Sequence, residues 1–286
     1  MSLSKVGVVG CGLMGSGIAE VCARAGIDTV VVEADDKALE AGRRRVERSL
    51  GRAVSAGKLT EDQRCDVSEA IAYTADYERL ADRELVVEAV HEDEQLKAQI
   101  FRRIDGLLQS PEAVIASNTS SVPIMKIAMA TARPDRVIGL HFFNPVPVLK
   151  LVELVPSLLT SEDTLRVVDD FAVGQLGKHT IRCKDRAGFI VNALLIPYLL
   201  SAIRMMESGF ATAEDIDTGM IEGCAHPMGP LALTDLIGLD TTSAVAQSLY
   251  EEFKEPLYAP PPLLNRMVEA GLLGRKSGRG FYSYAG

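Results

Sequence analysis

The stretch Val6-Gly7-Val8-Val9-Gly10-Cys11-Gly12-Leu13-Met14-Gly15 decides the fold of this chain. Its first four residues predict a short buried strand, and the residues that follow it predict an amphipathic helix. A Gly-x-Gly-x-x-Gly run in that context is typical of a dinucleotide-binding turn. Gly10 would permit the tight turn, Gly12 would let the backbone approach a pyrophosphate, and Gly15 would let the helix pack close to the strand. The alternative is a glycine-rich turn that binds nothing.

An acidic residue follows at the place that such a turn requires. The apolar run from Thr29 to Val32 predicts a second strand, and Glu33 ends it roughly twenty residues after the turn. A carboxylate there would hold the adenosine ribose hydroxyls and repel a 2′-phosphate, and Asp35 and Asp36 add to that charge. The pattern therefore favours NAD over NADP, with the phosphates bound at the helix N-terminus.

Apolar runs and helical patterns alternate as far as residue 183, which predicts a parallel sheet covered by helices. The alternation stops at a linker, 184–188, and the pattern after it is helical throughout. We therefore expect an α/β Rossmann-type domain over residues 1–184 and an all-α domain over residues 185–286. The helix expected at 189–206 is apolar on nearly every face, which indicates a subunit interface. Further strands are expected at 70–73, 85–90, 113–116, 137–141 and 181–183.

Two ionisable residues lie in neighbouring apolar segments. His141 ends one apolar run, and Glu153 lies inside another, Leu-Val-Glu-Leu-Val at 151–155. Burial of both is costly unless each has a partner. Pro145 and Pro147 allow the chain to bend between them, so the segments can run side by side with the carboxylate on one imidazole nitrogen. The other nitrogen would then transfer protons. The alternative is a buried pair that only holds two strands together.

Polar residues also gather where strands of the expected parallel sheet end. Glu88 ends one strand, and Ser-Asn-Thr-Ser-Ser at 117–121 ends the next. Because ligands of open α/β sheets bind at this edge, the serine-rich run can offer hydroxyls and an amide to a nicotinamide or a substrate oxygen. The alternative is a cap for the helix expected from Val122, which suits Ser121. Both roles can hold on different residues. No Gly-x-Ser-x-Gly elbow surrounds Ser120, so it is not predicted to be a nucleophile.

The helix expected at 38–56 is unusually basic for a chain of net charge −9. Arg44, Arg48 and Arg52 are spaced four apart and share one face. Such a face can receive a phosphorylated substrate tail. The alternative, which spacing alone favours, is a solvated face with Glu40 and Arg44 as an ion pair one turn apart.

The composition of the 286 residues excludes several classes of protein. The acidic balance argues against a nucleic-acid surface. Five scattered cysteines without a Cys-x-x-Cys pair indicate reduced thiols in the cytoplasm, and no metal site is expected. The apolar runs are too short to span a membrane, and the first strand begins too early to leave room for a signal peptide.

Taken in order, the motifs resemble those of the L-3-hydroxyacyl-CoA dehydrogenase family, in particular its short, stand-alone 3-hydroxybutyryl-CoA dehydrogenases. The resemblance spans almost the whole chain. It implies reversible, NAD-dependent oxidation of an L-3-hydroxyacyl-CoA of short chain to the 3-oxoacyl-CoA, and a homodimer formed through the helical domain. The segments that carry it lie at 10–17, 117–121, 141–147, 151–155, 188–192, 227–230 and 278–282.

The resemblance also implies roles for single residues. His141 is similar to the catalytic acid and base, and Glu153 to its orienting partner. Ser120 is similar to the serine that hydrogen-bonds the reacting oxygen at C3, and Asn192 to the asparagine that reaches in from the helical domain. The residues similar to substrate contacts are Ser120, Asn192 and, toward CoA, Ser49 and Lys58. The expected cofactor contacts are Gly10, Gly12, Leu13, Met14, Gly15, Glu33, Glu88, Glu92, Lys97, Asn118 and Asn144.

Two other functions stay open at this point. One is an NAD-binding protein with a structural or sensing role, and the other is a dehydrogenase for a hydroxy acid without CoA. The chain also departs from the family pattern in two places, since Ala187 stands where proline is common and Ala193 where arginine is common. The sequence sets neither the acyl chain length nor the physiological direction.

Overall fold

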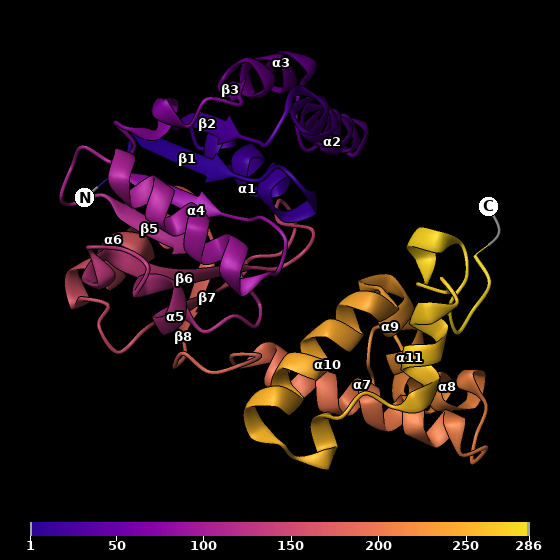
Figure 1. Ribbon diagram of the computed structural model, residues 1–286. Coiled ribbons are helices and arrows are strands. Elements are labelled where there is room, and N and C mark those ends of the chain that lie inside the picture. Colours follow the sequence, from indigo (N-terminus) through magenta and orange to yellow (C-terminus); the bar gives the residue numbers. More distant parts are fainter. Residues whose placement is uncertain (1, 285–286) are drawn as a thin grey trace. The chain divides into compact units, whose positions relative to one another are not determined.

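The computed structural model describes residues 2–284, and these fall into two units, one up to Arg186 and one from Ala187 onward. Figure 1 shows a sheet with helices in the first unit and only helices in the second. The expected boundary, between residues 184 and 185, lies in the same connecting segment. The α/β Rossmann-type arrangement followed by an all-helical region is confirmed, whereas the assignment of residues 1–184 and 185–286 to two separate domains stays a prediction.

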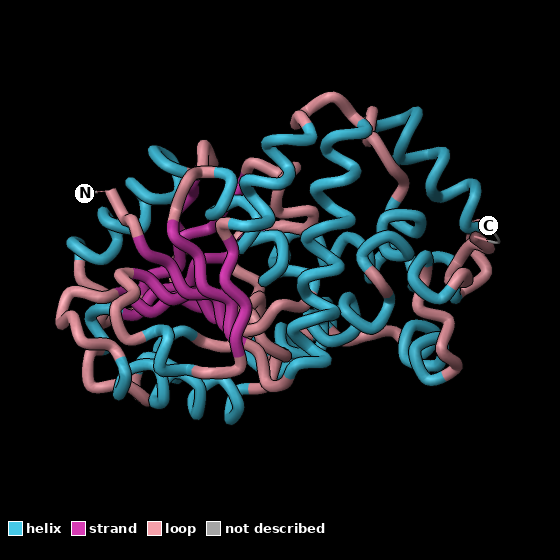
Figure 2. Tube along the Cα trace, turned by 90° about the horizontal axis from the view of Figure 1, so that it is seen from above, coloured by secondary structure: helices cyan, strands magenta, loops and turns pink. Residues whose placement is uncertain are grey.

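The first unit is built around one sheet of eight strands within the described residues, in the order β3-β2-β1-β4-β5-β6-β7-β8. All neighbouring strands are parallel except β6 and β7. Figure 2 shows helices on both sides of the sheet, which explains why the strands are apolar on both faces. The strands are β1 (Lys5–Val9), β2 (Asp28–Val32), β3 (Ile71–Thr74), β4 (Leu85–Glu88), β5 (Val114–Ser117), β6 (Val137–Phe142), β7 (Leu151–Pro156) and β8 (His179–Arg182).

Four of the six main helices of this unit begin at a residue whose side chain caps them. Asp35 accepts a hydrogen bond from the amide of Ala38 at the start of α2, and Asp93 accepts one from Leu96 at the start of α4. The main helices are α1 (Leu13–Arg24), α2 (Asp36–Ser55), α3 (Glu61–Glu69), α4 (Glu94–Leu107), α5 (Ile124–Ala128) and α6 (Glu162–Asp170), the last continuing as a π-helical turn over Phe171–Gln175.

The turn between β6 and β7 reverses the chain at the edge of the parallel part of the sheet. All six residues of β6 are buried, because the strand lies between β5 and β7. The antiparallel register pairs His141 with Glu153 and Leu140 with Leu154. Directly paired residues of antiparallel strands project on the same face of the sheet, so this register alone brings the histidine beside the glutamate.

The second unit packs its helices around a core that includes Ile196, Leu200 and Leu249. The helix α8 ends at Cys224 on a left-handed Ala225. No helix of the described residues is long and apolar enough to cross a membrane. The helices are α7 (Val191–Glu207), α8 (Ala213–Cys224), α9 (Pro230–Ile237), α10 (Leu239–Phe253) and α11 (Pro262–Glu269).

The glycine-rich segment near the C-terminus packs back on this unit. The carboxylate of Asp235 accepts hydrogen bonds from the amides of Phe281 and Tyr282, and the hydroxyl of Tyr284 also donates to it. The hydroxyl of Tyr282 donates to Asp217. Asp235 is 1% exposed, so these donors satisfy a carboxylate that would otherwise be buried without partners.

Candidate active site

The structure brings His141 and Glu153 into direct contact. The imidazole Nδ1 lies 2.7 Å from Oε2 of the glutamate, and the side chains are 7% and 0% exposed. A carboxylate shielded from water accepts this hydrogen bond strongly, so the proton sits on Nδ1 and the ring orientation is fixed. Nε2 is then the nitrogen that exchanges a proton with a bound molecule. The ring of Phe143 packs against the imidazole, with 4.6 Å between ring centroids.

The glycine turn has the geometry that a dinucleotide needs. Gly10 has a φ of +92°, and a Cβ on Gly15 would lie 1.8 Å from the carbonyl oxygen of Gly10. A Cβ on Gly12 would meet nothing within 4 Å among the described residues, which leaves space for a ligand. The helix α1 starts here without a side-chain cap, so its first amides can bind a phosphate. Leu13 is 64% exposed and Met14 is half-buried beside the turn.

Glu33 lies next to this turn, at the end of β2. Its Oε1 accepts a hydrogen bond from the amide of Cys11 at 2.5 Å, and its Oε2 accepts one from Ala34 at 3.1 Å. Arg45 of α2 donates to the carbonyl oxygen of Cys11 at 3.2 Å, a contact that the sequence pattern did not reveal. These bonds hold a negative charge beside the turn, which suits the ribose hydroxyls of NAD and opposes a 2′-phosphate.

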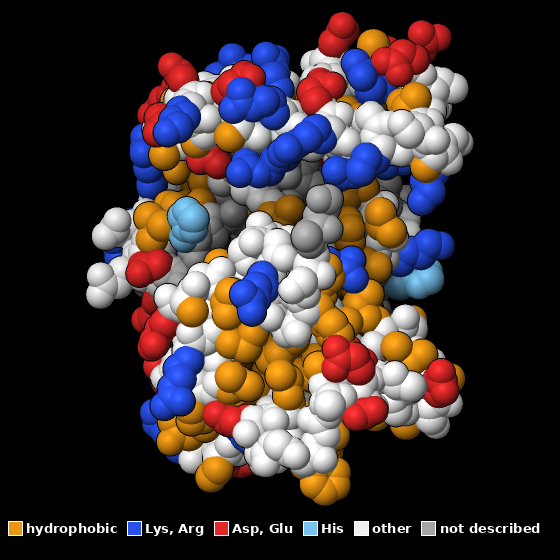
Figure 3. Space-filling view, turned by 90° about the vertical axis from the view of Figure 1, so that its right-hand side faces the viewer, with side chains coloured by type: hydrophobic (Ala, Val, Ile, Leu, Met, Phe, Trp, Pro, Cys, Tyr) orange, Lys and Arg blue, Asp and Glu red, His pale blue; other side chains and the backbone are white. Residues whose placement is uncertain are grey.

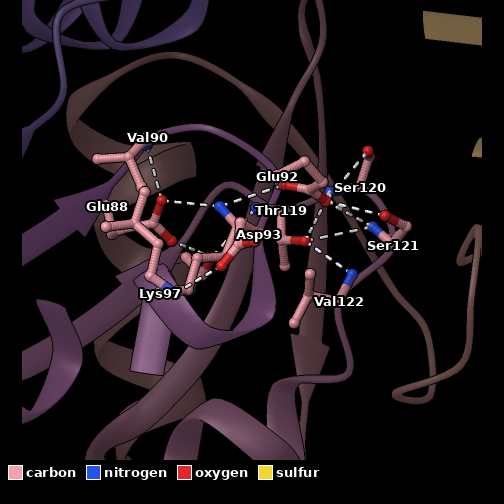
Figure 4. A network of polar contacts seen from close by, with 11 residues as sticks. Glu88, Val90, Glu92, Asp93, Lys97, Thr119, Ser120, Ser121 and Val122 are labelled. Carbon is pink, nitrogen blue, oxygen red and sulfur yellow. Dashed lines mark hydrogen bonds and ion pairs between the residues drawn. The ribbon is translucent and has the colours of Figure 1, made fainter. Parts of the chain in front are cut away.

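A polar network lies at the ends of β4 and β5, and Figure 4 shows it from close by. One oxygen of Glu92 accepts hydrogen bonds from the amides of Ser120 at 2.9 Å and Ser121 at 3.0 Å, and from the hydroxyl of Thr119. Its other oxygen lies 3.1 Å from Nζ of Lys97. Burial would raise the pKa of Glu92, but Lys97 and the hydrogen bonds from the serine loop (residues 117–121) outweigh it and lower that pKa.

The same network contains two residues that were expected to bind the cofactor. Glu88 accepts hydrogen bonds from Lys97 at 2.7 Å and from the hydroxyl of Ser117 at 2.6 Å. Glu88 and Lys97 are 0% and 1% exposed, so both are held inside the protein. In this structure they support the serine loop through Ser117 and Glu92. Their direct contact with a cofactor stays a prediction.

Ser121 does not cap the helix that follows the serine loop. α5 begins at Ile124, and the carboxylate of Asp185 accepts hydrogen bonds from the amides of Ile124 and Met125 at 2.8 and 2.7 Å. The cap therefore comes from a residue distant in sequence, and the expected role of Ser121 is wrong. Its amide and hydroxyl bond to Glu92 instead.

Two asparagines expected to contact the cofactor lie in the serine loop and in the β6–β7 loop (residues 143–150). The side-chain oxygen of Asn118 accepts a hydrogen bond from the amide of Phe142 at 2.9 Å, which ties the serine loop to the residue after His141. Asn144 lies in the β6–β7 loop and lines a cavity next to α1. Both predicted cofactor contacts therefore lie beside the imidazole or the glycine turn.

That cavity has a volume of about 220 Å³ and a basic wall. Arg45, Arg48, Ser49 and Arg52 of α2 line it, together with Glu20 of α1. Figure 3 shows Lys and Arg side chains gathered in the upper part of the view, which holds this region of the first unit. The two alternatives for this basic helix hold for different residues. Arg48 and Arg52 line the cavity, whereas Arg44 is exposed and pairs with Glu40 at 3.5 Å. Lys58 is exposed beyond the end of α2 and does not line the cavity.

The two remaining sequence expectations concern the second unit. Asn192 is the second residue of α7 and is half-buried. Ala187 is 3% exposed, and its amide donates to the carboxylate of Glu252 at 3.1 Å. A proline at this position has no N–H to donate, so the departure from the family pattern adds a hydrogen bond here. We find no structural reason for Ala193.

A Rossmann-type turn, an acidic residue after β2 and an imidazole–carboxylate pair on the same sheet define an NAD-dependent dehydrogenase. The chain belongs to the 3-hydroxyacyl-CoA dehydrogenase family. The model of that family's NAD binding domain matches residues 5–186, and the model of its C-terminal domain matches residues 188–284.

Relatives of known name agree with this assignment. The chain is 59% identical to a 3-hydroxybutyryl-CoA dehydrogenase of Mycobacterium tuberculosis, over 99% of both chains. It is 44% identical to the mitochondrial hydroxyacyl-coenzyme A dehydrogenase of Homo sapiens, over 99% of this chain and 91% of that one. The crystal structure of (S)-3-hydroxybutyryl-CoA dehydrogenase from Ralstonia eutropha superposes with a TM-score of 0.92 at 46% identity, covering 99% of this chain and 100% of that one.

Proposed function

We propose that this enzyme interconverts L-3-hydroxybutyryl-CoA and acetoacetyl-CoA, with His141 as the acid and base. The observation that carries the proposal is the 2.7 Å contact between Nδ1 of His141 and the unexposed carboxylate of Glu153. The glycine turn and Glu33 would hold NAD, which would supply the hydride acceptor for C3. The short acyl chain is supported by the names of the relatives that match over the whole length of this chain.

The proton of the reaction passes through the imidazole. Nε2 of His141 removes the proton of the C3 hydroxyl, and in the reverse direction it returns a proton to the C3 oxygen. Glu153 stabilises the imidazolium that forms and keeps Nδ1 protonated. Ser120 donates a hydrogen bond to the C3 oxygen, and Glu92 fixes the amide of that serine. We propose that Asn192 also takes part in the reaction.

Recognition of CoA is assigned to the basic cavity of the first unit. Three arginines and Ser49 on α2 supply hydrogen-bond donors and positive charge suited to phosphates. The experiment that tests reaction and substrate together is the loss of NADH absorbance on addition of acetoacetyl-CoA, with acetoacetate as the control and NADPH in parallel. Oxidation of NADH with the thioester alone is expected. Equal rates with acetoacetate would favour a dehydrogenase that does not use CoA.

The arginines offer a matched control for the CoA contact. The variant with Arg48→Gln and Arg52→Gln removes two charges of the cavity and is expected to raise KM for acetoacetyl-CoA roughly tenfold. Arg44→Gln removes a charge of the same helix that pairs with Glu40 outside the cavity, and should leave KM unchanged. If both changes had an equal effect on KM, the basic face of α2 would be a solvated surface that does not bind CoA. NADH that binds tightly without any turnover would favour a structural or sensing role.

We also propose that the enzyme is a cytoplasmic homodimer formed through its helical domain. An apolar cavity of about 340 Å³ on this unit, lined by Met205, Ile216 and Met220 among others, supports a protein partner. The five cysteines are all thiols in the structure, which suits a reducing compartment. Sedimentation equilibrium of the wild type and of Met205→Glu tests the dimer, since the charged variant should be monomeric.

A further inference from the structure

Lys178 is a buried cation that none of the steps above uses. It lies just before β8 and is 5% exposed. Its Nζ donates hydrogen bonds to the carbonyl oxygens of Val146 at 2.5 Å and Leu149 at 2.8 Å. The next residue, His179, donates its amide to the carbonyl oxygen of Lys150 at 2.8 Å. All three acceptors belong to the β6–β7 loop, which joins the strands of His141 and Glu153.

The opposite side of this loop packs on the helix of the glycine turn. A Cβ on Gly17 of α1 would lie 2.8 Å from Cβ of Val146 and 3.5 Å from Pro147, so glycine is needed for this close approach. Within the loop, the carbonyl oxygen of Pro145 accepts the amides of Val148 and Leu149. The loop is therefore held between α1 on one side and the ammonium group on the other.

Burial of the Lys178 ammonium group has an electrostatic cost. Its pKa is lowered by burial and by Arg24, while the carboxylate of Glu20 opposes that shift. Arg24 and Glu20, both on α1, lie 3.3 Å apart, and the second carboxylate oxygen of Glu20 has no hydrogen-bond partner among residues 2–284. An apolar side chain of similar length would fill the same space without the cost of burying a charge. What it would lack is the pair of directed bonds to the loop.

We propose that Lys178 is a positioning residue for the dehydrogenase reaction: its ammonium group fixes the β6–β7 loop, and through it the place of Asn144 and of the His141–Glu153 pair. The inference rests on the proposed roles of that pair. Loss of the two bonds would let the loop move relative to the glycine turn, where the cofactor binds. A misplacement of about 1 Å at a reacting group can cost on the order of a hundredfold in rate.

The decisive variant is Lys178→Met, which keeps the length of the side chain and removes the charge and the donors. We expect kcat to fall about ten- to a hundredfold and KM for NADH to rise several-fold. Lys178→Arg retains donors and charge and should recover part of kcat. If the methionine variant does not fold, Lys178→Gln, which keeps one amide donor, allows the same measurement.

Arg83 provides the matched control. It is also 5% exposed, and it forms ion pairs with Asp28 and Asp82 near the beginnings of β2 and β4. This is the end of the parallel strands opposite to the one that carries the glycine turn. Arg83→Met should lower the melting temperature, as Lys178→Met does, but leave kcat and KM near wild type. If Lys178→Met kept kcat and KM near wild type, as the control does at the same loss of stability, the inference would be overturned. Turnover that survives in His141→Ala would instead overturn the proposed function, so the two failures are distinguishable.

Discussion

Glu153 and Glu92 are two acidic side chains beside the expected site residues, and the protein holds them in different ways. Glu153 has no exposed surface, and its oxygen lies against one imidazole nitrogen. The side chain of Glu92 is 34% exposed and accepts hydrogen bonds from several groups of the serine loop as well as from Lys97. A charge without water acts strongly on its neighbour, whereas a partly solvated charge is screened. We therefore expect Glu153 to act through its charge and Glu92 through the geometry of the loop.

The largest effect is expected at the partner of Glu153. His141→Ala removes the proton-transferring group, so turnover should fall by about 10²–10⁴-fold, the usual contribution of a general acid and base. The glycine turn follows β1 and Glu33 follows β2, whereas His141 lies on β6, so NADH affinity should stay nearly unchanged. Steady-state rates and a fluorescence titration with NADH measure the two quantities. Turnover close to wild type would remove the reason to treat Glu153 as catalytic at all.

The next largest effect separates charge from hydrogen bonding at Glu153. Glu153→Gln leaves an amide oxygen that can still accept from Nδ1, but the imidazolium loses its negative partner. Because a neutral acceptor stabilises the imidazolium much less than a buried carboxylate does, we expect kcat to fall about ten- to a hundredfold. Combined with His141→Ala, the substitution should cost nothing further, because the two residues act as a unit. Independent, multiplying losses would show that Glu153 serves the fold and not the imidazole.

A smaller effect is expected at Glu92. Glu92→Gln keeps an oxygen that can accept the amides of Ser120 and Ser121, and loses the ion pair with Lys97. We expect kcat of Glu92→Gln to fall several-fold, less than in Glu153→Gln. Glu92→Ala, which has no acceptor, should lose more than Glu92→Gln. Initial rates with acetoacetyl-CoA measure these changes in kcat. If Glu92→Gln lost as much activity as Glu153→Gln, the contrast between charge and geometry would fail.

The smallest effect concerns the pH dependence of stability. The pKa of Glu92 is lowered in the folded protein. Its contribution to the free energy of unfolding is therefore present above the unfolded pKa and is lost as the pH falls through the folded value. Glu92→Gln removes this contribution, so the difference in melting temperature between wild type and variant should shrink between pH 5 and lower pH. A difference that stays constant on acidification would mean that folding does not lower the pKa of Glu92.

Short-range features were predictable because neighbours along the chain determine them. Gly10 adopts a positive φ and Gly15 touches the carbonyl of Gly10, as a turn between a strand and a helix requires. Glu33 ends β2 beside that turn. The alternative role of Ser121 as the cap of α5 was wrong. The sequence offers Ser121 as a local cap and shows no sign that Asp185, distant in sequence, caps this helix.

By itself, the sequence determined the alternation of strands and helices, the glycine turn with its acidic companion, and the helical character of everything after the linker. Each depends on residues a few positions apart. Only the tertiary structure decided that Arg45, Arg48 and Arg52 line the cavity while Arg44 faces solvent, and that Lys178 holds the β6–β7 loop. These contacts depend on how separate elements pack, and side-chain directions at such contacts follow from register and close packing, which no local pattern encodes.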